Sequence, residues 1–92
     1  MNITFIGGGN MADALLGGLL GKGFAPASLR VVEIDAASRG RLESKYPGLK
    51  AYASAREALR TGDIVVFAVK PQQMKEAVRS SGLAKDANLV IS

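Results

Sequence analysis

The chain contains no cysteine and no histidine among its 92 residues. The first absence excludes disulfides, thiolate nucleophiles and cysteine-ligated metals, and the second removes the commonest general base and metal ligand. We therefore expect no metal site and no catalytic triad, and we assign no residue a catalytic role. No apolar run reaches the length of about 18 residues that a membrane-spanning helix needs, and no signal-like segment opens the sequence. We expect a cytoplasmic protein with no membrane partner.

Aromatic residues are also few, with three Phe, two Tyr and no Trp. The formal net charge is +4, but the basic residues are scattered singly along the chain. Nucleic-acid-binding surfaces cluster their cations and often add aromatic side chains that stack on bases, so we expect no nucleic-acid partner. A mildly basic chain suits a small phosphate-bearing molecule instead.

Short apolar segments alternate with segments of helical period, and Gly, Pro or Ser stands at each junction. The pattern predicts strands over residues 3–6, 29–34, 49–52, 64–69 and 89–91. It predicts helices over about 10–22, 36–46, from 54 to near 62, and from 71 onward. This alternation is typical of one α/β domain with a Rossmann-like, doubly wound parallel sheet in the order 3-2-1-4-5. Ligands bind such sheets where the strand order reverses, here between the first and fourth strands.

Spacing within the helices gives three further expectations. The core-facing stripe of the first helix is predicted to contain Met11, Leu15, Leu16, Leu19 and Leu20. The corresponding stripe of the last helix contains Met74, Ala77 and Val78. Ser54 and Glu57 have the spacing of a capping box, in which each side chain bonds the backbone N–H of the other residue.

A glycine-rich motif lies where the first predicted strand turns into the first predicted helix. It matches the pattern G-x-G-x-x-G/A and reads Gly7-Gly8-Gly9-Asn10-Met11-Ala12. In this pattern Gly7 permits a tight turn, Gly9 lets a pyrophosphate approach the backbone, and Ala12 lets the helix pack closely on the strand. The helix N–H groups then face the phosphates. The alternative interpretation is a glycine-rich turn that binds no ligand. Asp13, the residue after this motif, is expected to be solvated.

An acidic residue at the end of the second strand is the next determinant of dinucleotide binding, and Asp35 stands near that place. Its carboxylate can accept from the 2′-hydroxyl of an adenosine ribose, which favours NAD, or it can simply cap the second helix. Ser38, Arg39 and Arg41 follow, and a guanidinium there can bind the 2′-phosphate of NADP. Both interpretations of Asp35 and both cofactors stay open.

A third motif ends the fourth predicted strand and reads Ala68-Val69-Lys70-Pro71. Small residues at this position let a nicotinamide riboside lie against the backbone, and Lys70 can bond a ribose or phosphate. Lys70 is equally well explained as a surface cation, since exposed lysines are common.

The two stretches FIGGGNMADALLGGLL and DIVVFAVKPQQM together resemble the N-terminal half of pyrroline-5-carboxylate reductase, and the match covers nearly the whole chain. The resemblance implies reduction of the C=N bond of 1-pyrroline-5-carboxylate to L-proline with NADPH or NADH, in proline biosynthesis. It implies that Gly7 through Ala12 hold the pyrophosphate and that Ala68 through Pro71 border the nicotinamide. The chain departs from the family at Asp35, where the family often reads the 2′-phosphate, and at Ala55.

The family's substrate site and dimer interface lie in a helical C-terminal domain, so residues 1–92 are expected to be a cofactor-binding domain without it. Such a chain is expected to bind dinucleotide, to catalyse little or nothing, and to form a homo-oligomer only with the second domain. Two alternatives remain. One is another NADP-dependent reductase of the F420-dependent oxidoreductase type, or a relative of prephenate dehydrogenase; the other is a non-catalytic nucleotide-sensing module.

Overall fold

A single parallel sheet organises the part of the chain that the computed structural model describes, residues 2–60, 63–81 and 88–91. Within these residues the order is β3-β2-β1-β4-β5, as predicted. The strands are β1 (Ile3–Ile6), β2 (Leu29–Val32), β3 (Lys50–Tyr52), β4 (Ile64–Phe67) and β5 (Asn88–Ile91). In the centre of the sheet Ile3 lies opposite Leu29 on one side and Ile64 on the other. The order therefore reverses between β1 and β4, where a ligand is expected.

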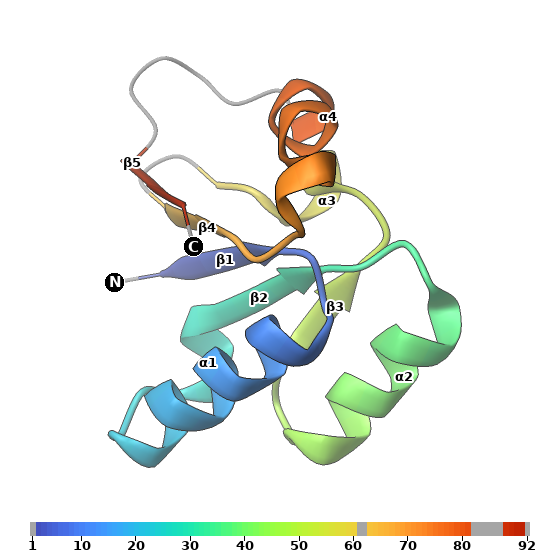
Figure 1. Ribbon diagram of the computed structural model, residues 1–92. Coiled ribbons are helices and arrows are strands. Elements are labelled where there is room, and N and C mark those ends of the chain that lie inside the picture. Colours follow the sequence, from blue (N-terminus) through green and yellow to red (C-terminus); the bar gives the residue numbers. More distant parts are fainter. Residues whose placement is uncertain (1, 61–62, 82–87, 92) are drawn as a thin grey trace.

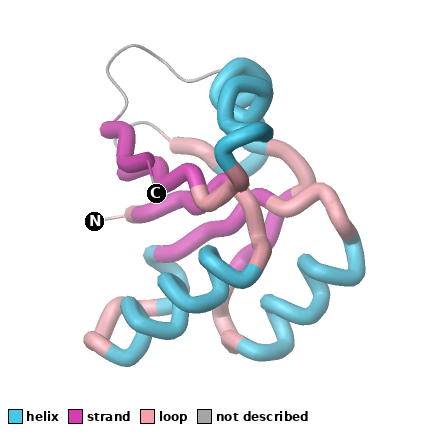
Figure 2. The backbone as a smooth tube through the Cα atoms, in the orientation of Figure 1, coloured by secondary structure: helices cyan, strands magenta, loops and turns pink. Residues whose placement is uncertain are grey.

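Helices cover both faces of the sheet, which makes the fold doubly wound as predicted (Figure 1). The longer elements are α1 (Asn10–Gly21), α2 (Ala36–Lys45) and α4 (Pro71–Ser81); α3 (Ala55–Ala58) and a 3₁₀ helix at Pro26–Ser28 are single turns. Helices α1 and α2 pack on one face, and α3 and α4 pack on the other. Figure 2 shows the strands enclosed between these two helical layers. Among the described residues no helix has the length and apolar character that crossing a bilayer requires.

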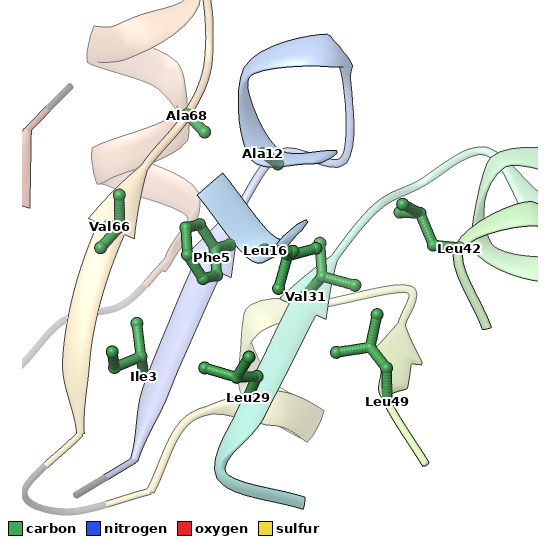
Figure 3. Packing of buried hydrophobic residues seen from close by; sticks show 10 residues of the cluster. All are labelled: Ile3, Phe5, Ala12, Leu16, Leu29, Val31, Leu42, Leu49, Val66 and Ala68. Atoms are coloured by element: carbon green, nitrogen blue, oxygen red, sulfur yellow. The ribbon is translucent and has the colours of Figure 1, made fainter. Parts of the chain in front are cut away.

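The larger core lies between the sheet and helices α1 and α2 (Figure 3). Phe5 from β1 and Leu16 from α1 are among its largest fully buried side chains, and burial of each contributes about 2 to 3 kcal/mol. The second core packs Ile6 and Phe67 against α3 and α4. Alternate strand residues thus point to opposite faces, as a sheet covered on both sides requires.

The predicted inner stripe of α1 is wrong at Met11 and Leu15. These side chains are 45% and 36% exposed, whereas Ala12 and Leu16 are fully buried. The helix carries apolar residues around more than one face, and the sheet covers only the face that contains Ala12 and Leu16. Val78 of α4 is likewise 37% exposed, while Met74 and Ala77 pack against the second core as predicted.

Three element boundaries differ from the prediction by two residues or more. Strands β2 and β4 end at Val32 and Phe67, two residues early, because the chain then leaves the sheet to form the loops of the site. Helix α3 ends at Ala58, where the chain becomes extended, and the predicted end at Gly62 lies outside the described residues. The predicted capping box is wrong: the Ser54 hydroxyl donates to the Glu57 carboxylate at 3.0 Å instead, and it caps no backbone N–H.

Candidate functional site

The glycine turn after β1 lies directly against the end of β4. Gly7 has φ +106°, and a Cβ built on it would stand 2.7 Å from the Ala68 carbonyl oxygen and 2.8 Å from Cγ1 of Val69. Only glycine fits, since another residue would be strained in φ and would also clash. The fold therefore brings together the two motifs singled out in the sequence, with Ala68 N–H donating to the Ile6 carbonyl at 2.9 Å.

The third glycine opens the first helix and leaves the space in front of it clear. Gly9 is the N-cap of α1 with extended backbone and no side-chain cap, and a Cβ on it would meet nothing within 4 Å. The N–H groups of the first helical turn have no intrahelical acceptors, and they lie at the positive end of the helix dipole. Ala12 is fully buried against the sheet, while Asn10 and Met11 are exposed. This geometry suits an anion such as a pyrophosphate.

Glu33 is a residue of this site that the sequence patterns did not single out. Its Oε1 accepts from the Gly8 N–H at 3.0 Å and its Oε2 accepts from the Asp35 N–H at 2.9 Å. A Cβ on Gly8 would lie 2.9 Å from Cβ of Glu33. The carboxylate thus joins the glycine turn to the loop after β2. The available signal was an acidic residue near the end of the predicted strand 29–34, after the apolar pair Val31 and Val32.

Asp35 caps the second helix. Its Oδ2 accepts from the backbone N–H of Ser38 at 2.9 Å and from the Ser38 hydroxyl at 2.8 Å. The hydroxyl, and then the backbone N–H, hold the pKa of Asp35 below its usual 3.8. The helix-capping interpretation is therefore confirmed, and the ribose contact of Asp35 stays a prediction.

The two arginines named for a 2′-phosphate lie beside this loop. Nη1 of Arg39 donates to the carbonyls of Glu33 at 2.8 Å and Ile34 at 3.0 Å. Arg41 makes a long contact of 3.4 Å with the Ser38 hydroxyl. Ile34 is 84% exposed, so the loop presents an apolar side chain beside these cations.

Asp13 is not solvated as expected, because it pairs with the end of α2. Nζ of Lys45 donates to both carboxylate oxygens, at 3.0 and 3.1 Å, and the Tyr46 hydroxyl donates to Oδ1. These bonds, from Tyr46 first and Lys45 second, lower the pKa of Asp13. The charge nearest the start of α1 is therefore directed toward α2 and partly neutralised.

Helix α4 begins directly after Lys70, at Pro71, as predicted. Pro71 is the first residue of the helix, and the Lys70 carbonyl accepts from the Gln73 N–H at 2.8 Å. The Lys70 side chain is exposed, and its ammonium group has no ion-pair partner in the described part of the chain. Within those same residues, no group of three or more carboxylate, imidazole or thiol side chains is placed to hold a metal ion.

Comparison with known proteins identifies the family of this chain. A family model described as NADP oxidoreductase, coenzyme F420-dependent, matches residues 2–92. The chain belongs to this family. Membership of the F420-dependent NADP oxidoreductase family implies a nicotinamide dinucleotide cofactor, in agreement with the geometry of the glycine turn.

Individual relatives confirm the resemblance to the N-terminal part of pyrroline-5-carboxylate reductases. The Pseudomonas aeruginosa enzyme is 36% identical over 91 residues, which is 98% of this chain and 33% of the relative. The Escherichia coli enzyme is 38% identical over 93 residues, covering 98% and 34%. The solved pyrroline-5-carboxylate reductase of Coxiella burnetii superposes with a TM-score of 0.75 at 37% identity, over 83% of this chain and 28% of that one. The chain spans about a third of the length of the curated relatives it matches.

Proposed function

We propose that this chain is the cofactor-binding domain of a pyrroline-5-carboxylate reductase and holds a nicotinamide dinucleotide across the glycine turn. The observation that carries the proposal is the fit of Gly7 against Ala68 and Val69, which joins the two family motifs at the point of strand-order reversal. The open space before Gly9 supports it, because a pyrophosphate needs that approach to the helix N–H groups.

The roles of individual residues follow from their positions. Gly7, Gly8 and Gly9 would line the pyrophosphate, with the N–H groups of Asn10, Met11 and Ala12 directed at it. Ala68 and Val69 would face the nicotinamide riboside, with Lys70 and Pro71 at its border. Asp35 would stand on the adenosine side of the site. When bound, the dinucleotide supplies the hydride; these residues bind and orient it.

The reaction of the whole protein would be reduction of the C=N bond of 1-pyrroline-5-carboxylate to L-proline. The support is the name of relatives that are 36 to 38% identical to this chain over the part of their length that it matches. The substrate site and the homo-oligomer interface would belong to a C-terminal domain, and residues 1–92 alone would bind cofactor and catalyse little. The cytoplasmic location stays a prediction.

The family description favours a second candidate, an oxidoreductase that works with coenzyme F420. Both candidates use the same dinucleotide site, so they are separated by their second substrate. Turnover of the full-length protein with 1-pyrroline-5-carboxylate would support the first, and turnover with coenzyme F420 in its place would support the second. Turnover with neither would favour a nucleotide-sensing module.

The cofactor site is tested by calorimetric titration of the chain with NADH and with NADPH, repeated on Gly9→Val. Because a Cβ at this position meets nothing within 4 Å, the variant should fold normally while its side chain fills the pyrophosphate approach. We expect affinity to fall by about tenfold or more. Gly18→Val is the matched control, since Gly18 is also open but lies at exposed positions of α1 away from the turn. Equal binding by the wild type and Gly9→Val would contradict the proposed site.

A further inference from the structure

We infer that Glu33 makes this chain select NADH over NADPH, in contrast to the NADP of its family description. The inference rests on the proposed function and deepens it, because it assigns the choice of cofactor to one residue. Its basis is the position of the Glu33 carboxylate between the glycine turn and the loop after β2.

The Glu33 carboxylate lies where the adenosine ribose of a bound dinucleotide is expected. The adenosine ribose is attached directly to the pyrophosphate, so it must lie next to the glycine turn and toward the end of β2. Glu33 is fixed there by the N–H groups of Gly8 and Asp35 at 3.0 and 2.9 Å, one on each oxygen. Each carboxylate oxygen can accept a further hydrogen bond, so both ribose hydroxyls of NADH would find acceptors.

Glu33 and Asp35, the acid that the sequence pattern indicates, point in different directions. The Asp35 carboxylate is turned toward α2 and accepts both Ser38 donors on one oxygen. In the residues that the structure describes, Glu33 is the acid that contacts the glycine turn itself. The charge of Glu33 is therefore nearer than that of Asp35 to the position of the ribose.

A phosphate added to the adenosine ribose would come close to the charge of Glu33. The 2′-phosphate of NADPH would place up to two negative charges beside a held carboxylate, which repels them. The cations that could offset this repulsion are Arg39 and Arg41. The guanidinium of Arg39 is held by the carbonyls of Glu33 and Ile34, so turning to a phosphate would break bonds that order the loop.

The test measures the dissociation constants of NADH and NADPH for the wild-type chain, Glu33→Gln and Glu43→Gln. Glutamine keeps the size of the side chain and one acceptor oxygen but removes the charge. Glu43 is the matched control, because its carboxylate also accepts a backbone N–H, that of Ala51 at 2.9 Å, but lies on the exposed side of α2. We expect the wild type to prefer NADH. The ratio Kd(NADPH)/Kd(NADH) should fall by about tenfold or more in Glu33→Gln and stay within about twofold in Glu43→Gln.

A measurement on the wild type alone covers the case in which Glu33→Gln does not fold. Salt screens both attraction and repulsion between charges. If Glu33 repels the 2′-phosphate, raising the salt concentration will lower the ratio Kd(NADPH)/Kd(NADH); if Arg39 or Arg41 binds that phosphate, the ratio will rise. Three outcomes would overturn this inference and leave the proposed cofactor site intact. They are a preference of the wild type for NADPH, a ratio Kd(NADPH)/Kd(NADH) that rises with salt, and a ratio that is unchanged in a folded Glu33→Gln. Failure of the wild type to bind either dinucleotide would overturn both this inference and the proposed cofactor site.

Discussion

At the scale of single residues, the three glycines of the turn have different physical reasons to lack a side chain. Gly7 is enclosed, with a positive φ and backbone and side-chain atoms of Ala68 and Val69 closer than any Cβ tolerates. Gly8 is constrained by Glu33, and Gly9 faces open space. The motif therefore combines a requirement of folding at its first position with a requirement of binding at its third.

This difference predicts opposite outcomes for two alanine variants. Gly7→Ala should lower the free energy of unfolding by about 2 kcal/mol or more, because it adds backbone strain to a clash with the Ala68 carbonyl. Gly9→Ala should change it by about 0.5 kcal/mol at most, since its Cβ contacts nothing. Urea-unfolding curves of the two variants check this. Equal losses of stability in the two variants would contradict the enclosed position of Gly7 and the open position of Gly9.

At the scale of elements, α1 and α2 are joined at one point by Asp13, Lys45 and Tyr46. The Tyr46 hydroxyl and the Lys45 ammonium group donate to the Asp13 carboxylate, and the hydroxyl also lies 3.2 Å from where a Cβ on Gly17 would stand. Gly17 inside the helix thus has a packing reason, whereas nothing in the structure explains Gly18. The pKa of Asp13 is lowered, and those of Tyr46 and Lys45 are raised, chiefly by these mutual hydrogen bonds.

The shifted pKa values define the pH range in which this contact stabilises the fold. A lowered Asp13 pKa gives stability that is present above the ordinary value of 3.8 and is lost as pH falls through the folded-state value. The raised Tyr46 pKa gives stability that is present below 10.0 and is lost as pH rises through its folded-state value. Asp13→Asn should therefore lower the melting temperature by about 5 °C at neutral pH and by much less near pH 2.

Melting curves of wild type and Asp13→Asn between about pH 2 and pH 8 measure this difference. Glu76, an exposed acid that forms a long ion pair of 3.5 Å with Arg79 of its own helix, gives the control Glu76→Gln. A difference for Asp13→Asn that did not shrink in acid would show that the ion pair is not its cause.

At the scale of the whole molecule, one end of the sheet forms the candidate site and the other end contains a buried carboxylate that links the strands. The candidate site lies at the carboxyl ends of β1, β2 and β4. Toward their amino ends, Asp63 is 3% exposed and accepts from Thr4 at 2.9 Å, from Arg30 at 2.8 Å and from the Arg60 N–H at 2.9 Å. One carboxylate thus links two neighbouring strands to the segment before a third.

We therefore expect Asp63→Ala to separate stability from binding. Removal of this acid leaves Arg30 and Thr4 without their partner and should reduce the free energy of unfolding by about 3 kcal/mol or more. The dissociation constant for dinucleotide, measured well below the melting temperature, should stay within about twofold because the site is distant. If that variant does not fold, Thr4→Val makes the same comparison with a loss of about 1 kcal/mol. A large loss of affinity in a folded variant would contradict the division of tasks.

Most of the fold was predictable, since alternating strand and helix periods and right-handed crossovers leave few arrangements for a parallel sheet. The contact of the glycine turn with the end of β4 followed from the same topology. The exposure of Met11 and Leu15 was not predictable, because periodicity identifies the apolar faces of a helix but not the one that the sheet covers. The partners of Asp13 lie 32 and 33 residues away, and Gly8, which donates to Glu33, lies 25 residues away. These contacts therefore depend on how the elements pack.

The contact between Gly8 and Glu33 restricts how residues 8 and 33 can change during evolution. Glycine at position 8 leaves the space that the Glu33 side chain fills, and Glu33 supplies the acceptor for the Gly8 N–H. A side chain gained at position 8 would displace Glu33, so a shorter residue at position 33 would have to arise with it. The two positions are expected to covary among homologues, and a change of cofactor preference in this lineage would then be inherited as a paired substitution.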